Sequence, residues 1–211
     1  MITNRSLFIV ITLYLAFGYA TTKADDKFPA TGQTACWNNL GLVISCDDTG
    51  QDGEIRAGAT LSYKDNGDGT ITDKNTGLQW EKQSRDGSIH DINNTYIWSV
   101  MQDHVLELNT TKFARHKDWR LPNIKELQSI VNYQKSEPAI SLAFNRKCIQ
   151  SCTVLKCSCT PPAAAYWSST TFLHAPDEAW VVDFMTGAVI LGYKTANLSV
   201  RAVRSGFGSK H

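Results

Sequence analysis

The six cysteines constrain this chain more than any other feature of its 211 residues. All of them lie beyond residue 24, and an even number of cysteines in an exported chain favours disulfide bonds. Cys36 and Cys46 enclose the segment CWNNLGLVISC, which is predicted to form a hairpin. These two cysteines are therefore expected to pair with each other.

The other four cysteines fall in a single loop with the sequence CIQSCTVLKCSC. Three pairings are possible there. Cys157 and Cys159 are too close for an unstrained bridge between them, so each is expected to reach back to Cys148 or Cys152. Four thiolates in one loop could instead bind zinc, but zinc sites more often show two CxxC pairs. An oxidising compartment also competes for the thiols, so we expect disulfides, no metal and no cofactor.

The first 24 residues read as a secretory signal peptide. Arg5 precedes an apolar run over residues 7–17, and small residues suitable for cleavage follow at Ala20 and Ala24. The run is shorter than a membrane-spanning helix, and no further span is expected in the mature chain. Removal of residues 1–24 takes away Arg5 and Lys23, which leaves 19 basic against 20 acidic residues, a net charge of −1. This balance argues against nucleic acid as the main ligand.

The rest of the chain divides into a lead-in, a main domain and a tail. Residues 25–59 are rich in Gly, Thr and Asp and are expected to be irregular apart from the cysteine hairpin. Residues 60–206 are expected to form the domain, and residues 207–211 a tail. Turn clusters separate predicted strands over 61–63, 70–72 and 78–80. The cluster at 65–69 resembles a calcium loop, but Lys64 and Asn75 stand where acidic ligands belong, so we interpret it as a turn.

Two helices are predicted between the early hairpin and a late sheet. The first covers residues 96–108 and buries an apolar face, with His104 expected largely outside it; the face comprises Trp98, Met101, Val105 and Leu108. The second begins after Asn123, which forms a capping box with Glu126, and is expected to end near Tyr133. Strands are predicted over 166–169, 179–184 and 188–193, and a run over 198–203 is expected to complete their sheet. This order of elements indicates an α+β domain.

No catalytic constellation is visible in the sequence. The histidines lack metal-ligand spacing, and no nucleophile elbow surrounds the serines of WSSTT. His174, Asp177, Glu178 and Asp183 could approach one another after folding, but exposed acids on a solvated rim are the commoner state. We therefore predict no catalytic residue. An enzyme of hydrolase or oxidoreductase type with a site built from loops remains the alternative.

A basic, aromatic-interleaved run favours a binding function. The segment KFARHKDWR lies between the helices, and further cations flank the cysteine-rich loop. Arginine forks suit sulfate and carboxylate oxygens, so an anionic glycan is a candidate ligand, with a surface protein as another. The candidate binding residues are Lys112, Arg115, His116, Lys117, Trp119, Arg120, Arg146 and Lys147.

The placed motifs resemble those of the bacterial Lcl C-terminal domain family, formerly a domain of unknown function. The pieces that carry the resemblance span nearly the whole mature chain; they include DNGDGTITDKNTGLQW (65–80), DWRLPNIKEL (118–127), YWSST (166–170), AWVVDFMTGAV (179–189) and VRAVR (200–204). The resemblance implies a fold like those of C-type lectins and formylglycine-generating enzymes, with two helices, a curved antiparallel sheet and a long loop region.

Departures from those folds limit what can be carried over to this chain. Glu137-Pro138-Ala139 and Trp167-Ser168-Ser169 lack the Asn and Asp that lectins use for calcium and sugar, and the cysteines do not match the formylglycine enzyme's thiol pair. Some family members end bacterial surface adhesins. We therefore expect an exported, non-enzymatic recognition module that is secreted, periplasmic or held at a bacterial cell surface.

Overall fold

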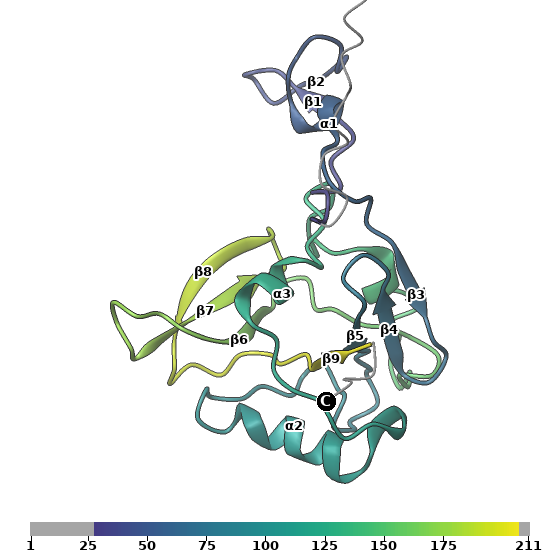
Figure 1. Cartoon of the computed structure of the whole chain (residues 1–211), viewed down its shortest axis with the longest axis vertical. Coiled ribbons are helices and arrows are strands. Elements are labelled where there is room, and N and C mark those ends of the chain that lie inside the picture. The colour runs from purple at the N-terminus through teal and green to yellow at the C-terminus, as the bar shows by residue number, and fades with distance from the viewer. Residues whose placement is uncertain (1–27, 207–211) are drawn as a thin grey trace, which may run out of the picture.

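The computed structural model describes residues 28–206, and the signal-peptide and tail predictions lie outside this range. A small projection, which we call the N-terminal knob (residues 34–56), stands off the main body on a narrow neck (Figure 1). The body contains two antiparallel sheets, with the helix α2 (Met101–Thr110) below them and the helix α3 (Ile124–Gln128) beside them. Among the described residues, no helix is both long and apolar enough to cross a membrane.

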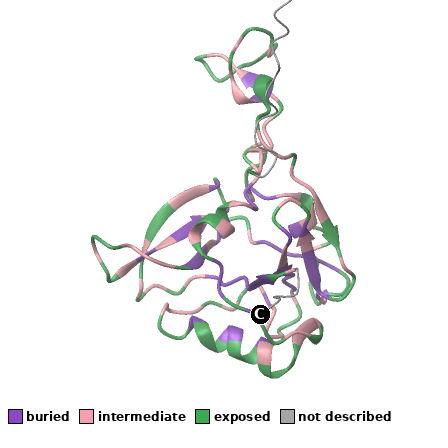
Figure 2. Ribbon diagram, viewed as in Figure 1, coloured by how far each residue is buried: buried purple, intermediate pink, exposed green. Residues whose placement is uncertain are grey.

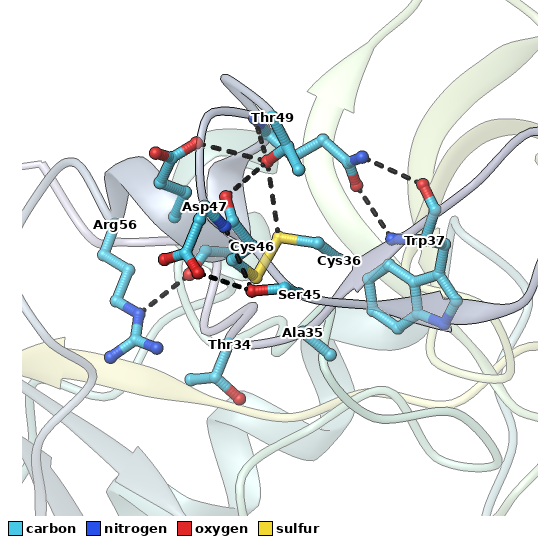
Figure 3. The surroundings of a disulfide bond; sticks show 12 residues. Thr34, Ala35, Cys36, Trp37, Ser45, Cys46, Asp47, Thr49 and Arg56 are labelled. Atoms are coloured by element: carbon cyan, nitrogen blue, oxygen red, sulfur yellow. Dashed lines mark hydrogen bonds between the residues drawn. A yellow bond between two sulfur atoms is a disulfide. The ribbon is translucent and has the colours of Figure 1, made fainter.

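The N-terminal knob is stapled by the Cys36–Cys46 disulfide, as predicted. Strands β1 (Cys36–Trp37) and β2 (Val43–Ile44) form the hairpin, and an unpredicted short helix, α1 (Asp52–Ile55), closes it. Around the bridge, the Thr49 hydroxyl donates to the Cys46 carbonyl over 2.9 Å (Figure 3). A side chain at Gly53 would meet the Ala35 carbonyl oxygen at 2.2 Å, so only glycine lets α1 pack this closely.

The first sheet of the body has the strand order β3-β4-β5-β9. Its members are β3 (Tyr63–Asp65), β4 (Thr70–Asp73), β5 (Leu78–Glu81) and β9 (Val203–Ser205). The three early strands confirm the predicted hairpin and following strand: β3 lies two residues later than predicted, and β4 and β5 begin as predicted and run one residue further. The prediction for the last run was wrong, because β9 pairs with β5, with Trp80 opposite Val203, and not with the late strands.

The second sheet has the order β6-β7-β8, from β6 (Ala165–Thr171), β7 (Glu178–Asp183) and β8 (Ala188–Tyr193). These strands agree with the predicted ones. The expected single curved sheet is therefore two separate sheets within an α+β body. Residues 198 and 199 make only isolated bridges, to Tyr96 and Tyr166, before the chain crosses to the first sheet.

Both predicted helices are present but shorter at one end. Helix α2 runs over Met101–Thr110, because residues 96–98 instead pair with the late part of the chain: the Tyr96 amide donates to the Leu198 carbonyl over 2.9 Å. Helix α3 runs over Ile124–Gln128 and ends before Ile130 and Val131, which are nevertheless buried. The capping box of Asn123 and Glu126 is present as predicted. Single turns of 3₁₀ helix, η1 (Phe113–Arg115) and η2 (Leu142–Phe144), lie in the connections.

Two apolar clusters form the core and share strand β6. Tyr166 belongs to the cluster under α3, with Trp80 and Phe144, whereas Trp167 points to the cluster under α2. The alternation of side chains along a strand explains why neighbouring residues serve different clusters. The buried segments line the interior between the sheets and helices, whereas the N-terminal knob is mostly exposed or half-buried (Figure 2).

The motifs DWRLPN and VRAVR lie side by side. Arg120 and Val203 exchange two backbone hydrogen bonds of 2.9 Å, and the Arg204 guanidinium donates to the Asp118 carboxylate over 2.7 Å. Trp119 is only 2% exposed and packs in the α2 cluster. The aromatic-basic turn before α3 therefore anchors the C-terminal strand to the body.

Candidate functional site

The cysteine-rich loop is a braced unit attached to the first sheet. Disulfides join Cys148 to Cys159 and Cys152 to Cys157, which confirms that Cys157 and Cys159 each reach back to an earlier cysteine. Two hydrogen bonds between Arg146 and Ser158 close the base of the loop, at 2.7 and 3.0 Å. Cross-linking fixes the backbone, so side chains on this loop are presented with little loss of backbone entropy on binding.

A polar hollow of about 200 Å³ opens beside this loop. We call it the basic hollow; its lining comprises Asp65, Ala143, Arg146, Lys147, Leu155, Lys156, Cys157 and Ser158. Three of these residues are cations, and Asp65 is the single acid. A second hollow of about 380 Å³ shares Asp65, Ala143 and Arg146 with the first and adds the apolar side chains of Tyr63 and Leu142. The two hollows thus form a continuous groove with a basic end and an apolar end.

The one acid in the basic hollow is already neutralised. Lys82 Nζ lies 2.8 Å from Asp65 Oδ2, and the Lys82 side chain is buried. Burial raises the pKa of Asp65, but the hydrogen bonds from the Lys82 ammonium and the Gly67 amide, together with the charge of Lys82, outweigh it, so the pKa falls below its usual range. The charges of Arg146, Lys147 and Lys156 are therefore available to an anionic ligand.

The sequence-predicted binding residues divide into two groups. Arg146 and Lys147 line the basic hollow. The remaining six lie on the segment from α2 to α3, where Lys112, Arg115 and Lys117 are exposed and His116 is half-buried. The structure therefore brings together only part of the predicted set, and it adds Lys156 to Arg146 and Lys147.

Two members of the predicted set have other partners. The Arg120 guanidinium forms a two-pronged ion pair with the Glu126 carboxylate, at 2.8 and 2.6 Å. Trp119 Nε1 donates to the Phe113 carbonyl over 3.1 Å from inside the core. Both side chains thus have structural contacts that a surface ligand would have to displace.

The turn η1 lies against the cysteine-rich loop. A side chain placed on Gly69 would meet both Phe113, at 2.9 Å, and Val154, at 3.1 Å, so these two side chains converge over the β3–β4 turn. Lys112, Ala114 and Arg115 all have positive φ, between 50° and 68°. This conformation is costly for residues other than glycine, and it persists where surrounding packing imposes it.

The sequence analysis missed a buried cluster of acid and histidines. Glu81 is fully buried; its Oε1 lies 2.6 Å from His90 Nδ1 and its Oε2 lies 2.8 Å from His104 Nε2. The Ala202 amide also donates to Oε2, over 3.0 Å. His104 is 2% exposed, so its expected place outside the buried face was wrong. Met101, His104, Val105 and Leu108 follow the spacing i, i+3, i+4, i+7, and a helix started at Met101 would have shown it.

These contacts set the charge states of the cluster. Burial raises the pKa of Glu81, but the charges and hydrogen bonds of His104 and His90 outweigh it and hold the pKa far below its usual range. Burial lowers the pKa of His104, but the Glu81 carboxylate outweighs it and raises the pKa. Because Glu81 is closed to solvent, the cluster stabilises the fold and offers a substrate no access.

The acidic group considered for catalysis does not form one site. Glu178 and Asp183 stand at opposite ends of β7, a separation of about 17 Å for a strand of this length. His174 and Asp177 are exposed in the β6–β7 loop. The four side chains therefore do not meet in a common cleft.

Comparison with known proteins agrees with the motifs described above. A search of the curated proteins found no match to the sequence. The family model described as the Lcl C-terminal domain matches residues 69–204, which include strands β4 to β8, helices α2 and α3 and the cysteine-rich loop. A match over more than half of the chain shows that this protein belongs to the Lcl C-terminal domain family.

Proposed function

We propose that this protein is an exported, non-enzymatic recognition module that binds an anionic glycan in the basic hollow. The observation that carries the proposal is the convergence of Arg146, Lys147 and Lys156 on one hollow whose single acid is paired with a buried lysine. Arginine and lysine at a fixed spacing suit sulfate and carboxylate groups. The apolar end of the groove, at Tyr63 and Leu142, suits the carbon face of a sugar ring.

The proposal also includes the compartment in which the protein functions and the fold type of its main body. Three disulfides are compatible with an oxidising environment outside the cytoplasm, and the N-terminal sequence is typical of a secreted, periplasmic or surface-held protein. Some members of the family form the ends of surface adhesins, which supports a role in attachment by analogy. We also propose a C-type-lectin-like topology, which the pairing of an early strand, β5, with the last strand, β9, supports.

Retention on immobilised heparin tests the binding site. The test variant removes the three cations of the basic hollow, Arg146→Ala/Lys147→Ala/Lys156→Ala. The control removes three exposed lysines elsewhere that make no ion pair within the described residues, Lys74→Ala/Lys125→Ala/Lys135→Ala. Exposed ion pairs contribute about 0.2–1 kcal/mol each, so the loss of three should weaken binding by about 3- to 150-fold relative to wild type.

The comparison of the two variants decides between a site and a general charge effect. Both lose three positive charges, so a purely nonspecific attraction would shift their elution to lower salt equally, and this result would contradict the proposal. A third variant, Lys112→Ala/Arg115→Ala/Lys117→Ala, measures the contribution of the predicted run. Arg120 is left intact in it, because its loss would also break the ion pair with Glu126.

A further inference from the structure

The four sulfur atoms of the cysteine-rich loop form one compact cluster. Cys152 Sγ lies 3.8 Å from Cys159 Sγ, and Cys157 Sγ lies 3.9 Å from the same atom, although these pairs belong to different disulfides. The sulfurs of Cys148, Cys152 and Cys159 all lie within 4.8 Å of one another. Two disulfides in one small loop need not pack against each other in this way. After reduction, the four thiols would therefore begin close to one another.

These spacings match a tetrahedral metal site. Zinc binds cysteine sulfur at about 2.3 Å, so adjacent sulfurs in a tetrahedral site are separated by about 3.8 Å. The two contacts between the disulfides already have this length. Once the two covalent bonds are opened, the pairs Cys148–Cys159 and Cys152–Cys157 must each move apart by less than 2 Å, and Cys157, which lies outside the group of three sulfurs, must turn toward Cys148. Rotation of cysteine side chains supplies such a movement without a change in the backbone.

The surroundings favour a negatively charged centre. Cys152, Cys157 and Cys159 are buried, and Cys148 and Ile92 pack against them. Arg201 Nη2 donates to the Cys159 carbonyl over 2.8 Å, and the Arg85 amide donates to the Cys152 carbonyl over 3.0 Å. The Nε atoms of both arginines are buried and have no hydrogen-bond partner within the part of the chain that the structure describes. The guanidinium of Arg201 therefore adjoins the cluster through the Cys159 carbonyl, and its Nε is an unused donor.

We propose that the reduced cysteine-rich loop is a zinc site in which Cys148, Cys152, Cys157 and Cys159 are the four ligands. Two dithiol molecules open the two disulfides; each gives two electrons and two protons and is itself oxidised to a disulfide. One Zn²⁺ then replaces the four thiol protons, which are released, and the resulting centre has a charge of −2. The loop thus exists in two braced forms, one held by disulfides and one held by zinc.

Metal titration of the full chain tests this site. The protein is reduced with a phosphine under anaerobic conditions, because a phosphine opens disulfides without the chelating thiols of a dithiol reagent. Zn²⁺ is then titrated against a chromophoric chelator, and Co²⁺ is titrated while its absorption is recorded. The reduced protein should bind one equivalent of zinc, release about four protons at pH 7, and show the sulfur-to-cobalt charge-transfer and visible bands of a tetrahedral thiolate site. The oxidised protein should bind none.

Two matched double variants locate the ligands. Cys148→Ser/Cys159→Ser removes one pair from the cluster and should lower zinc affinity by more than about 100-fold, which exceeds the loss seen when only a residue hydrogen-bonded to a metal ligand is replaced. Cys36→Ser/Cys46→Ser removes the pair in the N-terminal knob and should leave zinc affinity unchanged. Equal affinity in Cys148→Ser/Cys159→Ser, or loss in Cys36→Ser/Cys46→Ser, would overturn the proposal. So would a reduced wild-type protein that releases two protons or fewer, a measurement that needs no variant to fold.

Discussion

Replacement of Glu81 with glutamine should cost far more stability than the loss of any surface ion pair. At the 2.8 Å that separates Glu81 Oε2 from His104 Nε2, an effective dielectric constant of about 20 gives an attraction of about 6 kcal/mol. The desolvation of both groups offsets part of this attraction. Removal of one partner from a buried pair nevertheless costs about 3–5 kcal/mol, because the other charge remains buried. We expect a loss in this range for Glu81→Gln at pH 6.

The pH dependence of stability follows from the two pKa shifts. The pKa of Glu81 is lowered, so its stabilisation is present above its unfolded pKa of about 4.5 and is lost as the pH falls through the folded value. The pKa of His104 is raised, so its stabilisation is present below about 6.5 and is lost as the pH rises through the folded value. The pair therefore stabilises the fold most between about pH 4.5 and 6.5.

Urea unfolding followed by tryptophan fluorescence at pH 6 and pH 9 measures both effects. Wild type should lose stability between these values through His104, and Glu81→Gln should lose less, because its glutamine holds no imidazolium. Arg120→Gln is the control, since its ion pair with Glu126 is partly exposed and should contribute about 1 kcal/mol or less. Equal losses for Glu81→Gln and Arg120→Gln at pH 6, or wild type more stable at pH 9, would refute the reasoning.

Two further substitutions test other parts of the fold. Arg201→Met should lower the free energy of unfolding in urea by about 3–5 kcal/mol, because the Arg201 guanidinium donates hydrogen bonds in the core to Glu81, Gln83, Cys159 and Thr160. The exposed control Arg115→Met should change it by less than about 0.5 kcal/mol. Similar values for the two variants would contradict this role of Arg201. Asn123→Ala should lower the thermal midpoint by an amount equivalent to about 1 kcal/mol, whereas Asn123→Asp should keep most of the cap, and an unchanged midpoint for Asn123→Ala would argue against the capping box.

Local features of the structure were predictable from the sequence because their causes are local. The capping box needs only Asn123 and the residue three places later. The reach of a disulfide excludes a bridge between Cys157 and Cys159, but it leaves open which of them joins Cys148 and which joins Cys152. The strands of the second sheet follow from alternating apolar residues between turn signals. Each of these predictions depends on residues within a short stretch of chain.

The features that were missed depend on contacts between distant residues. Strand β9 pairs with β5 across more than a hundred residues, and no local pattern distinguishes this partner from β6. Arg201 is fully buried because four acceptors on two distant segments, residues 81–83 and 159–160, surround its guanidinium, whereas arginine is usually exposed. His104 follows Met101 by three positions on the buried side of α2, but only its contact with Glu81, on a distant strand, explains why an imidazole is buried there.

The residues of the candidate site could be predicted from the sequence only in part. A count of cations along the chain identified Arg146 and Lys147, and it also noted Lys156 beside the cysteine-rich loop. It could not show that these three share a hollow with the β3–β4 hairpin, or that Lys82 neutralises Asp65 there. Nor could it show that Trp119 is buried. Position in the fold, and not spacing in the chain, determines which cations face a ligand.

Backbone amide chemical shifts, recorded while a heparin-derived oligosaccharide is titrated into the isotope-labelled protein, test the central claim most directly. The largest changes should fall on residues 142–158 and on Tyr63 and Asp65, around the basic hollow. Changes concentrated in the β6–β7 loop or in the N-terminal knob, with residues 142–158 unaffected, would contradict it.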